Sequence, residues 1–76
     1  MNVYTFSTGG CKEAIYLEKL STTKEGIKDS IQDYLGNDFK VREIKFLLDK
    51  IEVNCYDIDT GFTEYKYYEL VTFEVI

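Results

Sequence analysis

The chain has 76 residues, of which 45% are hydrophobic and 16% aromatic, and it carries a net charge of −5 with no histidine. This length fits a single domain, residues 1–76, with one small core, since such a chain buries only about 60% of its unfolded surface. The charge argues against direct nucleic-acid binding, because phosphates would repel it, and no apolar run approaches the ~20 residues that span a bilayer.

The N-terminal segment is predicted to form a β-hairpin. Residues 2–7 are β-branched and aromatic, which is typical of a strand, and Thr8-Gly9-Gly10 then favours a turn. Residues 12–20 fit either a strand or a helix, because their apolar positions match neither period cleanly. A strand fits better, which makes residues 1–20 a hairpin.

The pattern predicts one helix over residues 23–35. Thr22 and Glu25 have the spacing of a capping box, in which the threonine oxygen accepts from the backbone of Glu25. Apolar residues then recur at helical spacing, from Ile27 to Leu35, and Gly36 suits the left-handed residue that ends a helix.

From residue 39 the apolar period changes to two, which predicts a strand over 39–47, a turn or bulge at 48–50, and then a further strand in which Ile51, Val53 and Cys55 share a face. The predicted fold is therefore α+β, in the order ββαβββ: a small antiparallel sheet with one helix on one face. The closing stretch, 70–76, is β-prone and apolar. Left as an edge it would invite pairing with another chain, so a homodimer through this C-terminal strand is one expectation.

The residues after 50 predict a hairpin around Gly61, in a three-residue turn with Ile58 opposite Phe62. This register puts six residues on an inner face: Ile51, Val53, Cys55, Tyr65, Tyr67 and Val71. The outer face then presents tyrosines among acids, an arrangement suited to protein contact. The expected contact residues, including the hairpin tip, are Glu52, Tyr56, Asp57, Asp59, Glu64 and Tyr68.

The leading functional hypothesis is a non-catalytic, cytoplasmic protein-binding module that uses no cofactor. With its negative charge we expect a host protein with a basic surface as partner. The strong preference for lysine over arginine and the absence of proline are typical of AT-rich coding sequence, so we expect a phage or mobile-element inhibitor of a nucleic-acid-handling or defence protein in a low-GC bacterium. A host housekeeping interaction module is a further alternative.

Another alternative is an oligomer that binds a nucleotide through Gly9, Gly10 and Lys12, although these residues lack the rest of a phosphate-loop motif. Residues 57–61 resemble the start of a calcium loop, but the glycine and the twelfth position do not fit, so no metal site is expected. Cys11 and Cys55 have no histidine to activate them. Free thiols are the default expectation for them, and a Cys11–Cys55 disulfide is the alternative.

Overall fold

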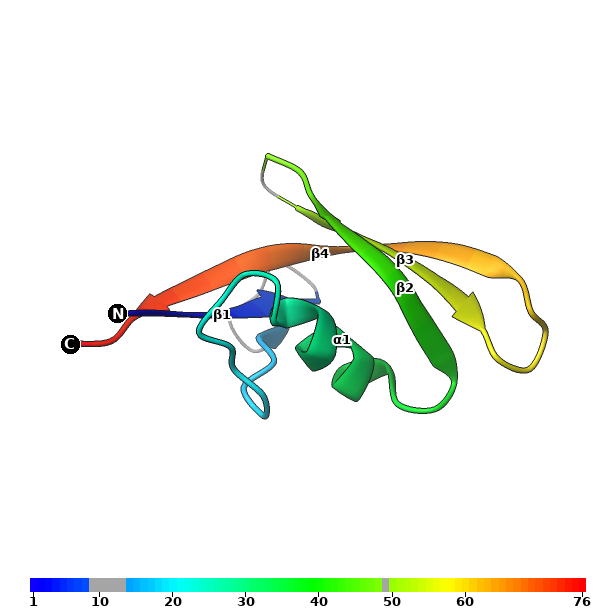
Figure 1. Ribbon diagram of the computed structural model, residues 1–76, viewed down its shortest axis with the longest axis horizontal. Coiled ribbons are helices and arrows are strands. Elements are labelled where there is room, and N and C mark those ends of the chain that lie inside the picture. Colours follow the sequence, from blue (N-terminus) through cyan, green and yellow to red (C-terminus); the bar gives the residue numbers. More distant parts are fainter. Residues whose placement is uncertain (9–13, 49) are drawn as a thin grey trace.

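The computed structural model describes residues 1–8, 14–48 and 50–76, and it confirms the predicted α+β class. Four strands form one antiparallel sheet and one helix packs against it, in the order β-α-β-β-β (Figure 1). The elements are β1 (Asn2–Ser7), α1 (Ile27–Leu35), β2 (Phe39–Phe46), β3 (Ile51–Asp57) and β4 (Thr63–Glu74). Across the sheet the strands lie in the order β1-β4-β3-β2.

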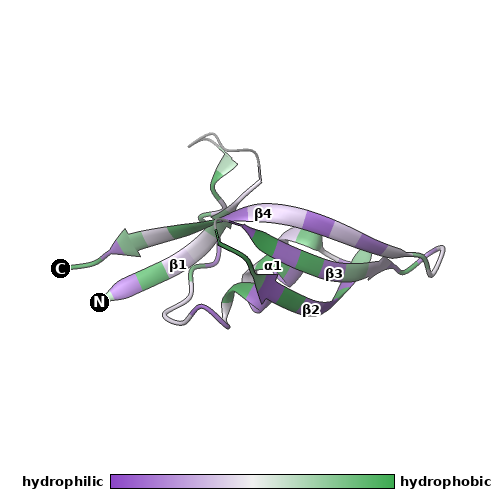
Figure 2. Ribbon diagram, turned by 90° about the horizontal axis from the view of Figure 1, so that it is seen from above, coloured by the Kyte–Doolittle hydropathy of each residue, from purple (hydrophilic) through white to green (hydrophobic). Residues whose placement is uncertain are grey.

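The core lies between α1 and one face of the sheet. Seven hydrophobic side chains are buried there: Phe6, Ile27, Ile31, Val41, Ile51, Val53 and Cys55. The three from β3 occupy alternate positions, and Figure 2 shows the alternation of hydrophobic and hydrophilic residues along β2 and β3. Each large apolar side chain removed from water contributes about 1.5–3 kcal/mol, so this face determines on which side of the sheet the helix packs.

Helix α1 ends as predicted but begins later, at Ile27 instead of near residue 23. Thr23 Oγ1 accepts a hydrogen bond from the backbone of Gly26 at 3.2 Å, so the chain makes a turn before the helix starts. The capping box predicted at residues 22–25 is therefore wrong. Gly36 has a φ of 68°, as expected of the residue after the helix. In the part of the chain that the structure describes, no helix has the length and hydrophobicity needed to cross a membrane.

The second strand predicted over residues 12–20 is wrong for its described part. Residues 14–21 run beside β1 without forming a regular strand, and two isolated bridges join them to it, Tyr4–Ser21 and Ser7–Ile15. The ring of Tyr16 stacks on Phe6 with 5.3 Å between centroids, and its hydroxyl donates to Asp33 of α1. These long-range contacts hold the segment against the core in place of a ladder. The turn predicted at Thr8–Gly10 lies mostly outside the described residues.

Strand β2 matches the predicted strand 39–47, and a bulge at Arg42 interrupts its pairing with β3. The turn predicted over 48–50 is closed by a bond from Leu47 N–H to the carbonyl of Lys50. Strand β4 is one continuous strand of twelve residues that changes partner in the middle. Its first half, Thr63–Tyr68, pairs with β3, and its second half, Glu69–Glu74, pairs with β1.

Candidate interaction surface

The β3–β4 hairpin forms as predicted, but its register is shifted by one residue. Tyr56 lies opposite Thr63 instead of Glu64, and Cys55 lies opposite Glu64 instead of Tyr65. The cause is the turn. Asp57 Oδ1 accepts from the backbone N–H groups of residues 59 and 60, and the Asp57 N–H bonds to the carbonyl of residue 62, which makes the loop one residue longer than expected. Because side chains alternate between faces, this shift exchanges the faces of every residue in β4.

The predicted contact residues therefore do not share one face. Glu52 and Tyr56 lie on the face of the sheet away from the helix, as predicted, whereas Glu64 and Tyr68 lie on the helix side. Tyr68 packs against the core, with its ring 5.1 Å from that of Phe6. Burial, more than neighbouring groups, raises the pKa of Tyr68 to about 12. Tyr68 is thus partly buried against the core, on the opposite face of the sheet from Glu52 and Tyr56.

Tyr65 and Tyr67, expected in the core, lie instead on the helix-free face, where they are 58% and 54% exposed. The hydroxyl of Tyr67 donates to Glu52 at 3.4 Å, and that carboxylate raises the pKa of Tyr67. Arg42, at the bulge, lies over the ring of Tyr56 at 4.6 Å from the centroid. The helix-free face thus carries three tyrosines beside charged groups of both signs.

A shallow hollow of about 220 Å³ opens on this face. Six residues of β2, β3 and β4 line it: Glu43, Ile44, Lys45, Glu52, Asn54 and Tyr65. Asn54 Oδ1 is buried there and accepts no hydrogen bond from any described residue. An unpaired buried acceptor costs about 1–3 kcal/mol, so the hollow is suited to a hydrogen-bond donor from outside the domain.

At the hairpin tip, Asp57 has a structural role because its carboxylate folds the turn. The backbone N–H of Ile58 donates to the carbonyl of Asp38, which attaches the tip to the segment after α1. Asp38 and Asp59 are exposed beside it, so this end of the sheet is acidic. Among the described residues, no group of three or more acids or cysteines lies close enough to hold a metal ion.

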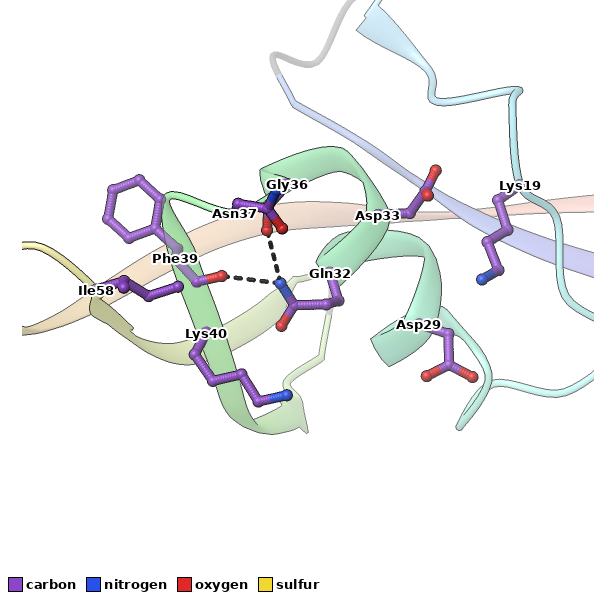
Figure 3. Close-up of a pocket in the computed structure, with 9 residues that line it drawn as sticks. All are labelled: Lys19, Asp29, Gln32, Asp33, Gly36, Asn37, Phe39, Lys40 and Ile58. Atoms are coloured by element: carbon purple, nitrogen blue, oxygen red, sulfur yellow. Dashed lines mark hydrogen bonds between the residues drawn. The ribbon is translucent and has the colours of Figure 1, made fainter.

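A larger hollow, of about 480 Å³, lies beside the C-terminal end of α1 (Figure 3). Its central polar side chain is Gln32, whose amide is fully used by the backbone around it. Nε2 donates to the carbonyls of Gly36 and Phe39, and Oε1 accepts from the N–H of Val41. Gln32 therefore supports the edge of β2, and this hollow offers no unpaired buried group in the described structure.

Cys55 is a buried free thiol between β2 and β4, and burial raises its pKa, so it packs as a small apolar residue. Cys11 and the proposed nucleotide contacts Gly9, Gly10 and Lys12 lie outside the described residues. No protein-family model, curated protein or solved structure matches this chain. What the domain does must therefore be inferred from its own surfaces.

The sequence analysis placed Tyr65 and Tyr67 on the inner face and did not include Asn54 among the contact residues. No signal in the sequence separates the two faces of β4, because its even positions carry Tyr68 and Leu70 while its odd positions carry Val71 and Phe73.

Proposed function

We propose that this chain is a non-catalytic binding module that docks on another protein through the helix-free face of its sheet. The observation that carries the proposal is the buried Asn54 Oδ1, which accepts no hydrogen bond from the described residues and lies in a hollow lined by two carboxylates, Glu43 and Glu52. A lysine or arginine of a partner would donate to all three acceptors. The ring of Tyr65, at the side of the hollow, would cover the stem of that side chain.

The surrounding surface supports this mode of docking. Tyrosine and arginine dominate the energetics of many interfaces, because their large side chains combine apolar area with hydrogen-bonding groups. Tyr65 and Tyr67 offer such area from adjacent alternate positions on one rigid strand. The face itself has balanced charge, with Lys40 and Lys45 near Glu43 and Glu52, so the partner is selected by one basic side chain in the hollow and not by a broad acidic face.

The proposed target is a host protein with a basic surface, such as a nucleic-acid-handling or defence protein that the module inhibits. The net charge of −5 and the acids at this end of the sheet, Asp57 and Asp59 at the hairpin tip and Asp38 beside it, favour association with such a surface and accelerate it. The composition, typical of AT-rich coding sequence, is the basis for proposing a phage or mobile-element origin in a low-GC bacterium.

Affinity capture from a low-GC bacterial lysate, followed by measurement of the captured pair with purified proteins, tests the proposal. Glu43→Lys and Tyr65→Ala should each weaken binding at least about tenfold, because the first puts a second cation at the hollow and the second removes an interface ring. Glu25→Lys, an exposed change of equal charge ahead of α1, is the control and should bind nearly as well as the wild type.

Thermal unfolding of all three variants separates lost binding from lost folding. Equal affinity of the wild type, Glu43→Lys and Tyr65→Ala for the same partner would show that this face is not the docking surface.

A further inference from the structure

The edges of the sheet are not equally open. The outer edge of β1 is covered by residues 14–21, whose backbone bonds to Tyr4 and Phe6. The outer edge of β2 is covered from Phe39 to Arg42 by side chains of α1: Gln32 bonds to the backbone on both sides of residue 40, and Lys28 Nζ donates to the carbonyl of Arg42. Covering an edge in this way prevents it from pairing with another chain.

Strand β4 is different, because each of its halves has one strand neighbour. The Asp57 N–H bonds to the carbonyl of residue 62, and bonded pairs alternate along an antiparallel ladder. Even-numbered residues of β4 therefore bond to β3, while Thr63, Tyr65 and Tyr67 direct their N–H and C=O groups to the opposite edge.

Strand β1 lies on this same edge of β4, but only beside the second half of the strand. Val75 N–H bonds to the carbonyl of Met1, so odd-numbered residues of the second half of β4 face β1. Figure 1 shows β1 beside the C-terminal part of β4 alone. Along Thr63–Tyr67 no described residue pairs with this edge, so within residues 1–8, 14–48 and 50–76 the outward N–H and C=O groups of Thr63, Tyr65 and Tyr67 have no backbone partner.

We propose that Thr63–Tyr67 pairs with the same segment of a second copy of this chain, antiparallel, about a twofold axis at Tyr65. In this register Tyr65 bonds to Tyr65 of the second copy, and Thr63 bonds to its Tyr67. The two residues between them, Glu64 and Lys66, then lie opposite Lys66 and Glu64 of the second copy. These are non-hydrogen-bonded pairs, in which side chains approach most closely, so opposite charges meet twice.

Charge complementarity supports pairing at this segment. Glu64 and Lys66 are partly exposed on the same face and already lie 3.5 Å apart within one chain, so each can turn to a partner without losing a charged neighbour. The other open edge, at Leu70–Glu74, contains no basic residue and offers no such pair. The dimer does not depend on the proposed function. It keeps Tyr65 and Tyr67 on the helix-free faces and joins the two faces into one surface.

The oligomeric state of the full chain, measured by sedimentation velocity over a range of concentrations, tests this pairing. The wild type should form dimers. Glu64→Lys and Lys66→Glu should each weaken the dimer at least about tenfold, because twofold symmetry turns two attractive pairs into two repulsive ones. The double variant restores both pairs and should dimerise within about threefold of the wild type. A monomeric wild type up to millimolar concentration, or a double variant no better than the single ones, would overturn the proposal.

A second pair of variants tests the backbone. Tyr65→Pro removes an N–H that points away from β3, and proline is tolerated where the N–H faces an open edge. It should leave circular dichroism unchanged and abolish the dimer. Thr72→Pro removes an N–H from the other open edge and should leave the dimer intact. If Thr72→Pro loses the dimer and Tyr65→Pro keeps it, the contact lies on the second half of β4 and the proposed pairing of Thr63–Tyr67 is refuted.

Discussion

Gln32 is expected to be the polar side chain on which the fold depends most. It stands on α1 and replaces the missing neighbour strand of β2, with bonds of 3.1 and 2.8 Å from Nε2 to two carbonyls and of 2.8 Å from the Val41 N–H to Oε1. Val41 itself is buried, so water cannot easily take over its N–H when the glutamine is removed. Gln32→Ala is therefore a test of how the edge of the sheet is stabilised.

The expected loss can be worked from these contacts. Each net hydrogen bond contributes about 1 kcal/mol, which gives about 3 kcal/mol for three bonds. Alanine regains about 0.4 kcal/mol through its higher helix propensity. The free energy of unfolding should thus fall by about 2 to 3 kcal/mol, a large share of the roughly 4–11 kcal/mol expected for a domain of this size.

Urea unfolding followed by circular dichroism measures this loss, and amide hydrogen exchange reports on the edge directly. In Gln32→Ala the Val41 amide should exchange much faster, and the open edge should make the protein more prone to aggregate. Asp29→Ala, an exposed change on the same helix, is the control and should cost less than about 1 kcal/mol. A loss below about 0.5 kcal/mol together with a still protected Val41 amide would refute the role of Gln32.

Two further predictions follow from the backbone and from burial. Gly61 has a φ of 76°, and no atom lies near the position that a β-carbon would take. Gly61→Ala should therefore lower the free energy of unfolding by about 1 kcal/mol through backbone conformation alone, and Gly61→Asn should lower it by less. Equal stability of the wild type and both variants in urea would contradict this. Tyr68 has a folded pKa of about 12 against 10.0 when unperturbed, so its contribution to stability is complete below about pH 10 and is lost as pH rises toward 12. Tyr68→Phe should therefore be less sensitive to alkaline unfolding than the wild type, and an unchanged pH profile would count against burial of the hydroxyl.

Local signals predicted most of the elements correctly. The period of two along β2 and β3, and the apolar stripe of α1 before Gly36, depend on neighbours in the sequence, and the structure has these elements within a few residues of their expected bounds. The strand prediction for residues 14–20 was wrong because distant contacts decide their conformation. These contacts are the stack of the Tyr16 ring on Phe6 and the hydrogen bond from the Tyr16 hydroxyl to Asp33. No local period could have shown that Tyr16 would reach the helix.

The register error has a different cause and a larger consequence. Strand β4 carries tyrosines at consecutive positions, Tyr67 and Tyr68, so either face of the strand can be buried at similar cost, and the hydrophobic pattern alone does not select one. The choice falls to the turn, where the Asp57 carboxylate lengthens the loop by one residue. That single residue turns Tyr68 toward the core and Tyr65 toward the helix-free face.

A functional surface inferred from a β-hairpin is therefore only as reliable as the turn that sets its register. Here the inner residues of β3, Val53 and Cys55, are buried under either register, which is why the fold class holds while the contact surface changes. The same shift that removes Tyr68 from the surface places Tyr65 beside Asn54 and its unpaired oxygen. In the predicted register Tyr65 would not lie beside Asn54, so the hypothesis depends on a geometric fact, the length of one turn, that the alternation of residues could not supply.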